Sequence, residues 1–207
     1  MSNSHLSFLS CFVAFTAFFA SSAASADITG TAWNARKRPP APVSEGLTEN
    51  DNGIRGMDEN LQCFTDAFPA VDAGTQPTPG QSYVECHLLH FDPVNDPLTR
   101  TGRFKFDNEI MALVYSSGNL DAWDGICDDA IGMGYPAAGS EPYRGLEPTV
   151  TPADQVTLTP NPAGRWNRVE VTAEVRGNTD HVRVITCCDD VPGCDGVIPD
   201  WSLWPGI

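Results

Sequence analysis

Short runs with strand patterning, separated by turn residues, follow one another between residues 57 and 187. Phe104 and Phe106 alternate with Arg103 and Lys105, and residues 166–176 alternate in the same way, which predicts strands with one buried face. Residues 110–115 are almost continuously apolar, which predicts a strand buried on both faces. With further runs at 61–68, 82–91, 154–159 and 180–187, the chain is predicted to be all-β, an antiparallel two-sheet β-sandwich or jelly roll of about eight strands.

Two local arrangements follow from these runs. Residues 177–180, Gly-Asn-Thr-Asp, fit a hairpin loop, so we expect 166–176 and 180–187 to be antiparallel neighbours. Within 82–91, alternation places His87 on one face and His90 on the other, so the two histidines cannot chelate one ion. We expect one half-buried, hydrogen-bonded histidine and one surface histidine.

The N-terminus has the pattern of an export signal. Residues 6–20 are apolar, and Ala24-Ser25-Ala26 fits a cleavage site, which predicts a mature chain that begins at Asp27. No second apolar run is long enough to span a membrane. We expect a secreted protein with a signal peptide (1–26), a flexible proline-rich arm (27–56), a β-sandwich domain (57–190) and a disulfide-pinned C-terminal coil (191–207).

Six cysteines follow the predicted signal, an even number that indicates up to three disulfides in an oxidising compartment. The spacing does not choose among the 15 pairings that six cysteines allow. The Cys-Cys-x5-Cys spacing fits no zinc pattern, so disulfides are favoured over a metal-thiolate site. These residues are Cys63, Cys86, Cys127, Cys187, Cys188 and Cys194.

The formal net charge of −15 argues against nucleic acid as a partner. It suits divalent cations or a basic partner, although an acidic surface also serves solubility alone. Within the irregular segment 117–145, Asp121, Asp124 and Asp128 are candidate Ca²⁺ ligands; the competing interpretation is an exposed acidic loop. Asp121 and Asp124, three residues apart, would share one side of a short helical turn. No other cofactor is indicated.

Candidates for ligand binding lie nearer the C-terminus. Trp201 and Trp204 would stack on sugar rings or, alternatively, pack over the edge of the sandwich. Arg144 is a further candidate for ligand binding, or it forms an ion pair with Glu147 that holds the long loop. An enzyme would need a histidine with a carboxylate or a carboxylate pair, namely His90 with Asp92 or Asp121 with Asp124. No nucleophile elbow, H-E-x-x-H or phosphate loop is present.

Four segments carry a resemblance to a known group: SYVECHLLHFDP (82–93), FKFDNEIMALVYSSGNLDAWD (104–124), YRGLEP (143–148) and DHVRVIT (180–186). Together they resemble a family of uncharacterised secreted domains in bacterial exported proteins, often with a PEP-CTERM sorting tail. The resemblance covers roughly 57–187 and implies an extracellular β-sandwich with no established activity. This chain departs from the family in its six mature cysteines and in lacking the hydrophobic tail.

These observations lead to a functional expectation that rests mostly on fold-level analogy. The chain is expected to be a secreted, non-catalytic binding or extracellular-matrix protein for carbohydrate, with a structural calcium. Its partner would be an extracellular polysaccharide or a matrix protein. The alternatives are an extracellular polysaccharide hydrolase or lyase, and a structural protein of a wall or shell.

Overall fold

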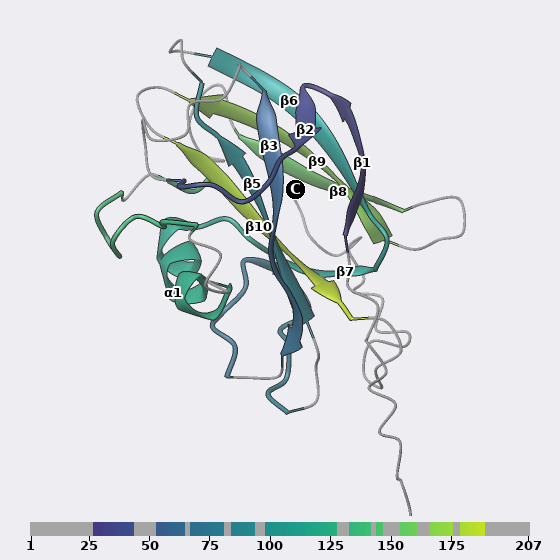
Figure 1. Ribbon diagram of the computed structural model, residues 1–207, viewed down its shortest axis with the longest axis vertical. Helices are drawn as coiled ribbons and strands as arrows, with labels where there is room; N and C mark the ends of the chain where they lie inside the picture. Colours follow the sequence, from purple (N-terminus) through teal and green to yellow (C-terminus); the bar gives the residue numbers. More distant parts are fainter. Residues whose placement is uncertain are drawn as a thin grey trace, which may run out of the picture.

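The computed structural model describes residues 27–43, 53–64, 67–80, 84–93, 98–127, 133–141, 144–146, 154–160, 166–175 and 179–188. These residues form ten strands and one helix (Figure 1). The strands are β1 (Ile28–Trp33), β2 (Ala35–Lys37), β3 (Ile54–Phe64), β4 (Ala73–Gly74), β5 (Val84–Phe91), β6 (Leu98–Phe106), β7 (Ile110–Val114), β8 (Gln155–Pro160), β9 (Trp166–Val175) and β10 (Asp180–Cys187). The helix is α1 (Ser117–Cys127).

The strands form two sheets. One has four strands in the order β1-β6-β9-β8, and the other has six in the order β2-β3-β5-β10-β7-β4. Every pairing of these strands is antiparallel except that of β2 with β3. The predicted all-β class with two sheets is therefore confirmed.

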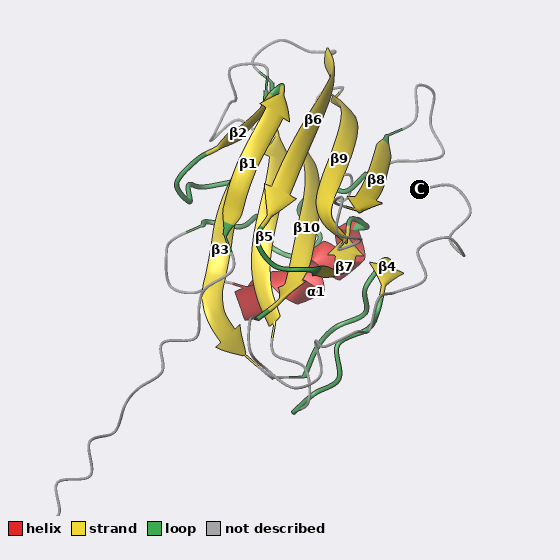
Figure 2. Ribbon diagram, turned by 90° about the vertical axis from the view of Figure 1, so that its right-hand side faces the viewer, coloured by secondary structure: helices red, strands yellow, loops and turns green. Residues whose placement is uncertain are grey.

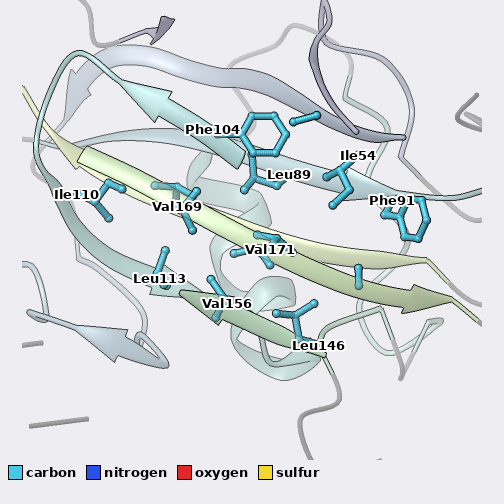
Figure 3. Close-up of a cluster of buried hydrophobic side chains, with 14 of the residues drawn as sticks. Ile54, Leu89, Phe91, Phe104, Ile110, Leu113, Leu146, Val156, Val169 and Val171 are labelled. Atoms are coloured by element: carbon cyan, nitrogen blue, oxygen red, sulfur yellow. The ribbon is translucent and has the colours of Figure 1, made fainter. Parts of the chain in front are cut away.

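A shared apolar core lies between the two sheets (Figure 3). Phe104, Val169 and Val171 enter it from the four-stranded sheet, while Leu89 and Leu113 enter it from the six-stranded sheet. These side chains are at most 2 % exposed. The period-two alternation in the sequence corresponds to this arrangement, because each strand turns every second residue toward the opposite sheet.

The predicted hairpin between 166–176 and 180–187 is wrong. Strand β9 pairs with β6 and β8, whereas β10 pairs with β5 and β7 in the other sheet. Both strands turn valines toward the same core, Val169 and Val171 from one side and Val182 and Val184 from the other. Alternation alone does not distinguish neighbours in one sheet from strands that face each other across a core.

The flexible arm predicted over 27–56 is also not what its described residues form. Residues 28–33 are an edge strand of the four-stranded sheet, and residues 35–37 are an edge strand of the six-stranded sheet. Figure 2 shows β1 beside β6, with β2 at the other sheet. The sequence concealed them because Ile28 alone in β1 and Ala35 alone in β2 are buried, so neither strand alternates.

Helix α1 occupies part of the segment predicted to be irregular. It begins beside the Asp72 carboxylate, which accepts hydrogen bonds from the backbone N–H groups of Tyr115 (2.6 Å) and Ser116 (2.7 Å). The side chains of Ser116 and Asn119 donate to the same carboxylate, each at 2.7 Å. An acidic acceptor at a helix N-terminus stabilises the unpaired N–H groups there.

One face of α1 covers the six-stranded sheet on the side away from the shared core (Figure 1). Leu120, Trp123 and Cys127 lie with Cys86 and Ile185 of the sheet in a second apolar cluster. The Cys86–Cys127 disulfide, with the two Cα atoms 5.8 Å apart, fixes the helix to β5. Cys187 and Cys188 are also disulfide-bonded. Cys194 and the side chain of Cys63 lie outside the part of the chain that is described.

Candidate functional site

The outer face of the six-stranded sheet gathers charged side chains beneath α1 and beside the described residues of 133–141 and 144–146. Arg183 on β10 is fully buried and holds Glu59 of β3 in a two-point contact. Its Nε donates to Glu59 Oε2 at 2.7 Å, and its Nη2 donates to Glu59 Oε1 at 2.6 Å. Nη2 also donates to Asp124 Oδ1 of α1 at 3.0 Å, and Nη1 donates to the Leu120 carbonyl at 3.2 Å. Arg183 therefore ties the sheet to the helix.

Three further residues complete this cluster, which we call the covered cluster: Glu59, Asp121, Asp124, Tyr135, Arg144 and Arg183. The Tyr135 hydroxyl donates to Glu59, and its ring lies 5.2 Å from the Arg183 guanidinium carbon. Arg144, 1 % exposed, donates from Nη2 to Asp124 Oδ1 at 2.9 Å and has Nε 3.4 Å from Asp121 Oδ1. Two guanidinium groups thus face three carboxylates.

The pKa directions agree with permanent charge in the covered cluster. Burial by itself lowers the pKa of Arg183, but the charge and hydrogen bonds of Glu59 outweigh it, with help from Tyr135 and Asp124, and the pKa is raised. Burial and the Glu59 charge raise the pKa of Tyr135. Arg183 stays charged and Tyr135 stays neutral at physiological pH, so the cluster is a network of ion pairs and hydrogen bonds.

The candidate calcium ligands are part of this network. Asp121 and Asp124 do share one side of a helix, as the spacing predicts, and both contact Arg144. Asp128 lies outside the described residues, as does Glu147, the predicted partner of Arg144. A structural calcium stays a prediction, but the two described carboxylates already have guanidinium partners. Arg144 is buried, so it offers no exposed side chain to a ligand.

His90 and His181 form a pair on the same outer face. His90 Nδ1 lies 2.7 Å from His181 Nε2, and both residues are fully buried. Burial, followed by the charges of His90, Arg144 and Arg183, lowers the pKa of His181 well below its ordinary value. The expected surface histidine is wrong, since His87 and His90 are both 0 % exposed. Asp92, the other member of the proposed His90 dyad, is buried as well.

A second histidine arrangement lies on the inner face of the same sheet, where sequence reasoning missed it. Asp58 Oδ1 is 2.7 Å from His87 Nδ1, and His87 Nε2 is 2.9 Å from Thr186 Oγ1. Although burial raises the pKa of Asp58, hydrogen bonds from His87 and Asp27 and the charge of His87 hold it well below its usual range. The order acid–histidine–hydroxyl is that of a nucleophilic triad.

This arrangement differs from a working triad because substrate has no access to it. His87 and Thr186 are 0 % exposed, and the His87 ring lies 4.9 Å from the Phe106 ring of the opposite sheet. Thr186 Oγ1 therefore reaches no substrate in this conformation. The three residues are separated by 29 and 99 positions in the chain, so no local motif announces them.

Glu59, a member of the covered cluster, also lies next to the Cys86–Cys127 disulfide. Glu59 has a carboxylate oxygen within 4.8 Å of the sulfurs of Cys86 and Cys127, a set that resembles metal ligands by distance. Both sulfurs are joined in the disulfide, and both Glu59 oxygens accept hydrogen bonds from Arg183. In the oxidised protein, the two sulfurs are bonded to each other and the Glu59 oxygens are paired with Arg183, so these atoms serve the fold rather than an ion.

The outer face of the four-stranded sheet differs because no described element covers it. Trp33, at the end of β1, is 59 % exposed and is the one large apolar side chain exposed among the described residues. Its φ is +61°, a left-handed conformation that is strained for a bulky residue. The Arg103 guanidinium carbon lies 4.3 Å from the centroid of the Trp33 ring, and Arg103 Nη2 donates to Glu170 Oε2 at 2.8 Å.

Polar side chains extend from this tryptophan across the sheet in rows set by the strand register. One row joins Arg103, Glu170 and Thr157 on adjacent strands, and the next joins Thr101, Thr172 and Gln155. A third joins Lys105, Arg168 and Thr159. We call this surface, together with Trp33, the open face. It presents hydroxyl, amide and charged groups in regular rows beside one aromatic ring.

Trp201 and Trp204, the predicted sugar-stacking residues, lie outside the described residues. Among the described residues, the exposed tryptophan is Trp33. Its place among polar residues in ITGTAWNAR is the sequence signal that could have found it. Within the described part of the chain, no helix has the length and apolarity needed to cross a membrane.

Comparison of the chain with protein-family models, with curated proteins and with solved structures finds no match. The resemblance of the four sequence segments to secreted domains of bacterial exported proteins therefore stays a hypothesis.

Proposed function

We propose that this chain is a secreted, non-catalytic carbohydrate-binding protein, that its ligand lies across the open face, and that its two packed sheets belong to the jelly-roll class of β-sandwich. The observation that carries the proposal is Trp33, an exposed and conformationally strained ring supported by Arg103. Strained backbone conformations of this kind cluster at functional sites.

The chemistry of the open face supports this ligand class. An aromatic face suits the C–H face of a sugar ring, and a stacked arginine keeps the ring in place through a cation–π contact. Hydroxyl and amide groups such as Thr101, Thr157 and Gln155 form hydrogen bonds with sugar hydroxyls. Secretion is supported by the export-signal pattern and by the disulfides, which persist in oxidising compartments.

The test is affinity electrophoresis of the oxidised protein through gels that contain single polysaccharides, neutral and acidic. We expect retardation by at least one glycan, loss of retardation in Trp33→Ala, and retention in Trp33→Phe. Thr29→Ala, at an exposed position of β1, is the matched control and is expected to behave as the wild type. Binding that survives Trp33→Ala would refute the open face as the binding surface.

The alternative is a polysaccharide hydrolase or lyase, favoured by the geometry of Asp58, His87 and Thr186. It requires the two sheets to separate enough to admit substrate to Thr186. Product analysis on any retarding glycan distinguishes the two functions: soluble fragments that disappear in Thr186→Val would support the enzyme. Binding without fragments supports the binding protein.

A further inference from the structure

Charge is distributed unevenly over the open face. In the row of Lys105 and Arg168, the neighbours on the outer strands are Gly30 and Thr159, so this row holds two cations and no acid. In the next row, Glu170 is already paired with Arg103. The far end of the face carries Thr99 opposite Glu174. The face is therefore positive at one end.

The juxtaposition of Lys105 and Arg168 is unfavourable by itself. They are directly opposite on adjacent antiparallel strands, an arrangement in which like charges repel. Lys105 is exposed and Arg168 half-exposed. The acid two positions beyond Lys105, Asp107, directs its Oδ1 to the backbone N–H groups of Asp27 and Asn108 rather than to this pair of cations. Such a pair is stabilised when an anion lies between the two cations.

We propose that the glycan bound by the open face is a polyuronate, a polysaccharide with a carboxylate on its sugar rings. One carboxylate binds between Lys105 and Arg168, where the arginine fork matches its planar geometry, while another ring of the chain stacks on Trp33. Arg103 lies between these two points, two residues from Lys105 along β6. The inference rests on the proposed carbohydrate-binding function and names its ligand class.

The overall charge of −15 opposes an anionic ligand at long range. At physiological ionic strength this repulsion is screened beyond about 8 Å, so local charges decide the contact. Among the described residues, seven acids are buried, against two arginines, Arg144 and Arg183. The buried acids are Asp58, Glu59, Glu85, Asp92, Asp124, Asp154 and Asp180.

The experiment uses the oxidised protein with polygalacturonate, its fully methyl-esterified form and dextran sulfate as probes at physiological salt. The ester keeps the sugar backbone and removes the charge. We expect binding to polygalacturonate and at least about ten-fold weaker binding to the ester, the size expected for a lost charged hydrogen bond. The Lys105→Gln/Arg168→Gln variant is expected to lose a similar factor, with its melting temperature unchanged or raised because the two cations no longer repel each other.

Arg38→Gln is a control for the loss of positive charge outside the open face: it removes one of the two charges that the double variant loses, from an exposed position, and it is expected to bind as the wild type. Equal binding of the ester and the acid would overturn the polyuronate inference while leaving the carbohydrate-binding function in place. Stronger binding of dextran sulfate would overturn the carboxylate assignment. Wild-type binding by the Lys105/Arg168 variant would overturn the location. If the protein binds no member of a wide glycan panel, the proposed carbohydrate-binding function is overturned.

Discussion

The outer faces of the two sheets carry similar residue types in opposite environments. On the six-stranded sheet, the covered cluster lies under α1 and satisfies its charges internally, with Arg183 and Glu59 both 0 % exposed. On the four-stranded sheet, Arg103 and Glu170 form a partly exposed pair beside Trp33. The difference shows that charged residues on a strand do not locate a binding surface by themselves. What lies over the strand decides whether they hold the fold together or meet a ligand.

The largest difference between the two faces is expected when Arg183 of the covered cluster is truncated. Arg183→Ala leaves the Glu59 carboxylate buried without its guanidinium partner and removes one of the two cations that contact Asp124, and we expect a loss of about 3–5 kcal/mol in the free energy of unfolding. Urea denaturation measures it. The matched variant on the open face is Arg103→Ala, for which we expect a loss of about 0–1 kcal/mol because its ion pair is partly solvated. Equal losses in the two variants would contradict the distinction between the faces.

Removal of the disulfide tests whether α1 is needed to cover the cluster. Cys86→Ala/Cys127→Ala opens a link between residues 41 positions apart, and we expect a loss of about 2–4 kcal/mol. Hydrogen exchange of α1 should increase more than that of β6 or β9, because those strands belong to the other sheet. Uniformly increased exchange would show that the disulfide stabilises the whole domain rather than the cover.

The pH dependence of stability sharpens the comparison further. The folded-state pKa of His181 lies below its ordinary value of 6.5, so below that pH the unfolded chain binds a proton that the folded chain does not. Stability is fully present above pH 6.5 and should fall by up to about 1.4 kcal/mol per pH unit below it, until the folded-state pKa is reached. Denaturation midpoints between pH 5 and 8 measure the slope. His181→Asn should flatten it, and an unchanged slope would exclude His181 as its source.

Asp58 contributes in a separate and more acidic window. Its pKa in the folded protein is below the ordinary 3.8, so its stabilising effect is present above that pH and is lost as the pH falls further. Asp58→Asn should therefore reduce the pH dependence below about 4 and leave the range above pH 5 unchanged.

The smallest effect on stability is expected at Trp33, the residue proposed to contribute most to glycan binding. Trp33→Gly removes the left-handed strain, but it also increases the backbone entropy of the unfolded chain. The two effects oppose each other, so we expect a change within about 1 kcal/mol together with complete loss of glycan binding. A large destabilisation would show that Trp33 supports the fold rather than a ligand.

Local patterns predicted the strands well and their partners poorly. Residues 102–107 and 166–176 alternate, and strands β6 and β9 lie at those positions. The hairpin was wrong because the valines of β9 and β10 meet across the core. The covered cluster was only partly visible, since Asp121 and Asp124 lie one helical turn apart but Glu59 and Arg183 are 124 residues apart. Trp33 was missed because residues 27–56 were predicted to be a flexible arm, although its place among polar residues in ITGTAWNAR is a signal of exposure.

The N-terminal segment of the described chain belongs to both sheets. Strand β1 covers the edge of β6, and after Asn34 strand β2 covers the edge of β3. A single cut or deletion that removes residues 27–37 would therefore uncover two strand edges at once, each with a row of unpaired N–H and C=O groups. Long exposed edges of this kind recruit strands from other molecules. The same eleven residues that carry the proposed sugar-binding tryptophan thus also protect the protein against aggregation.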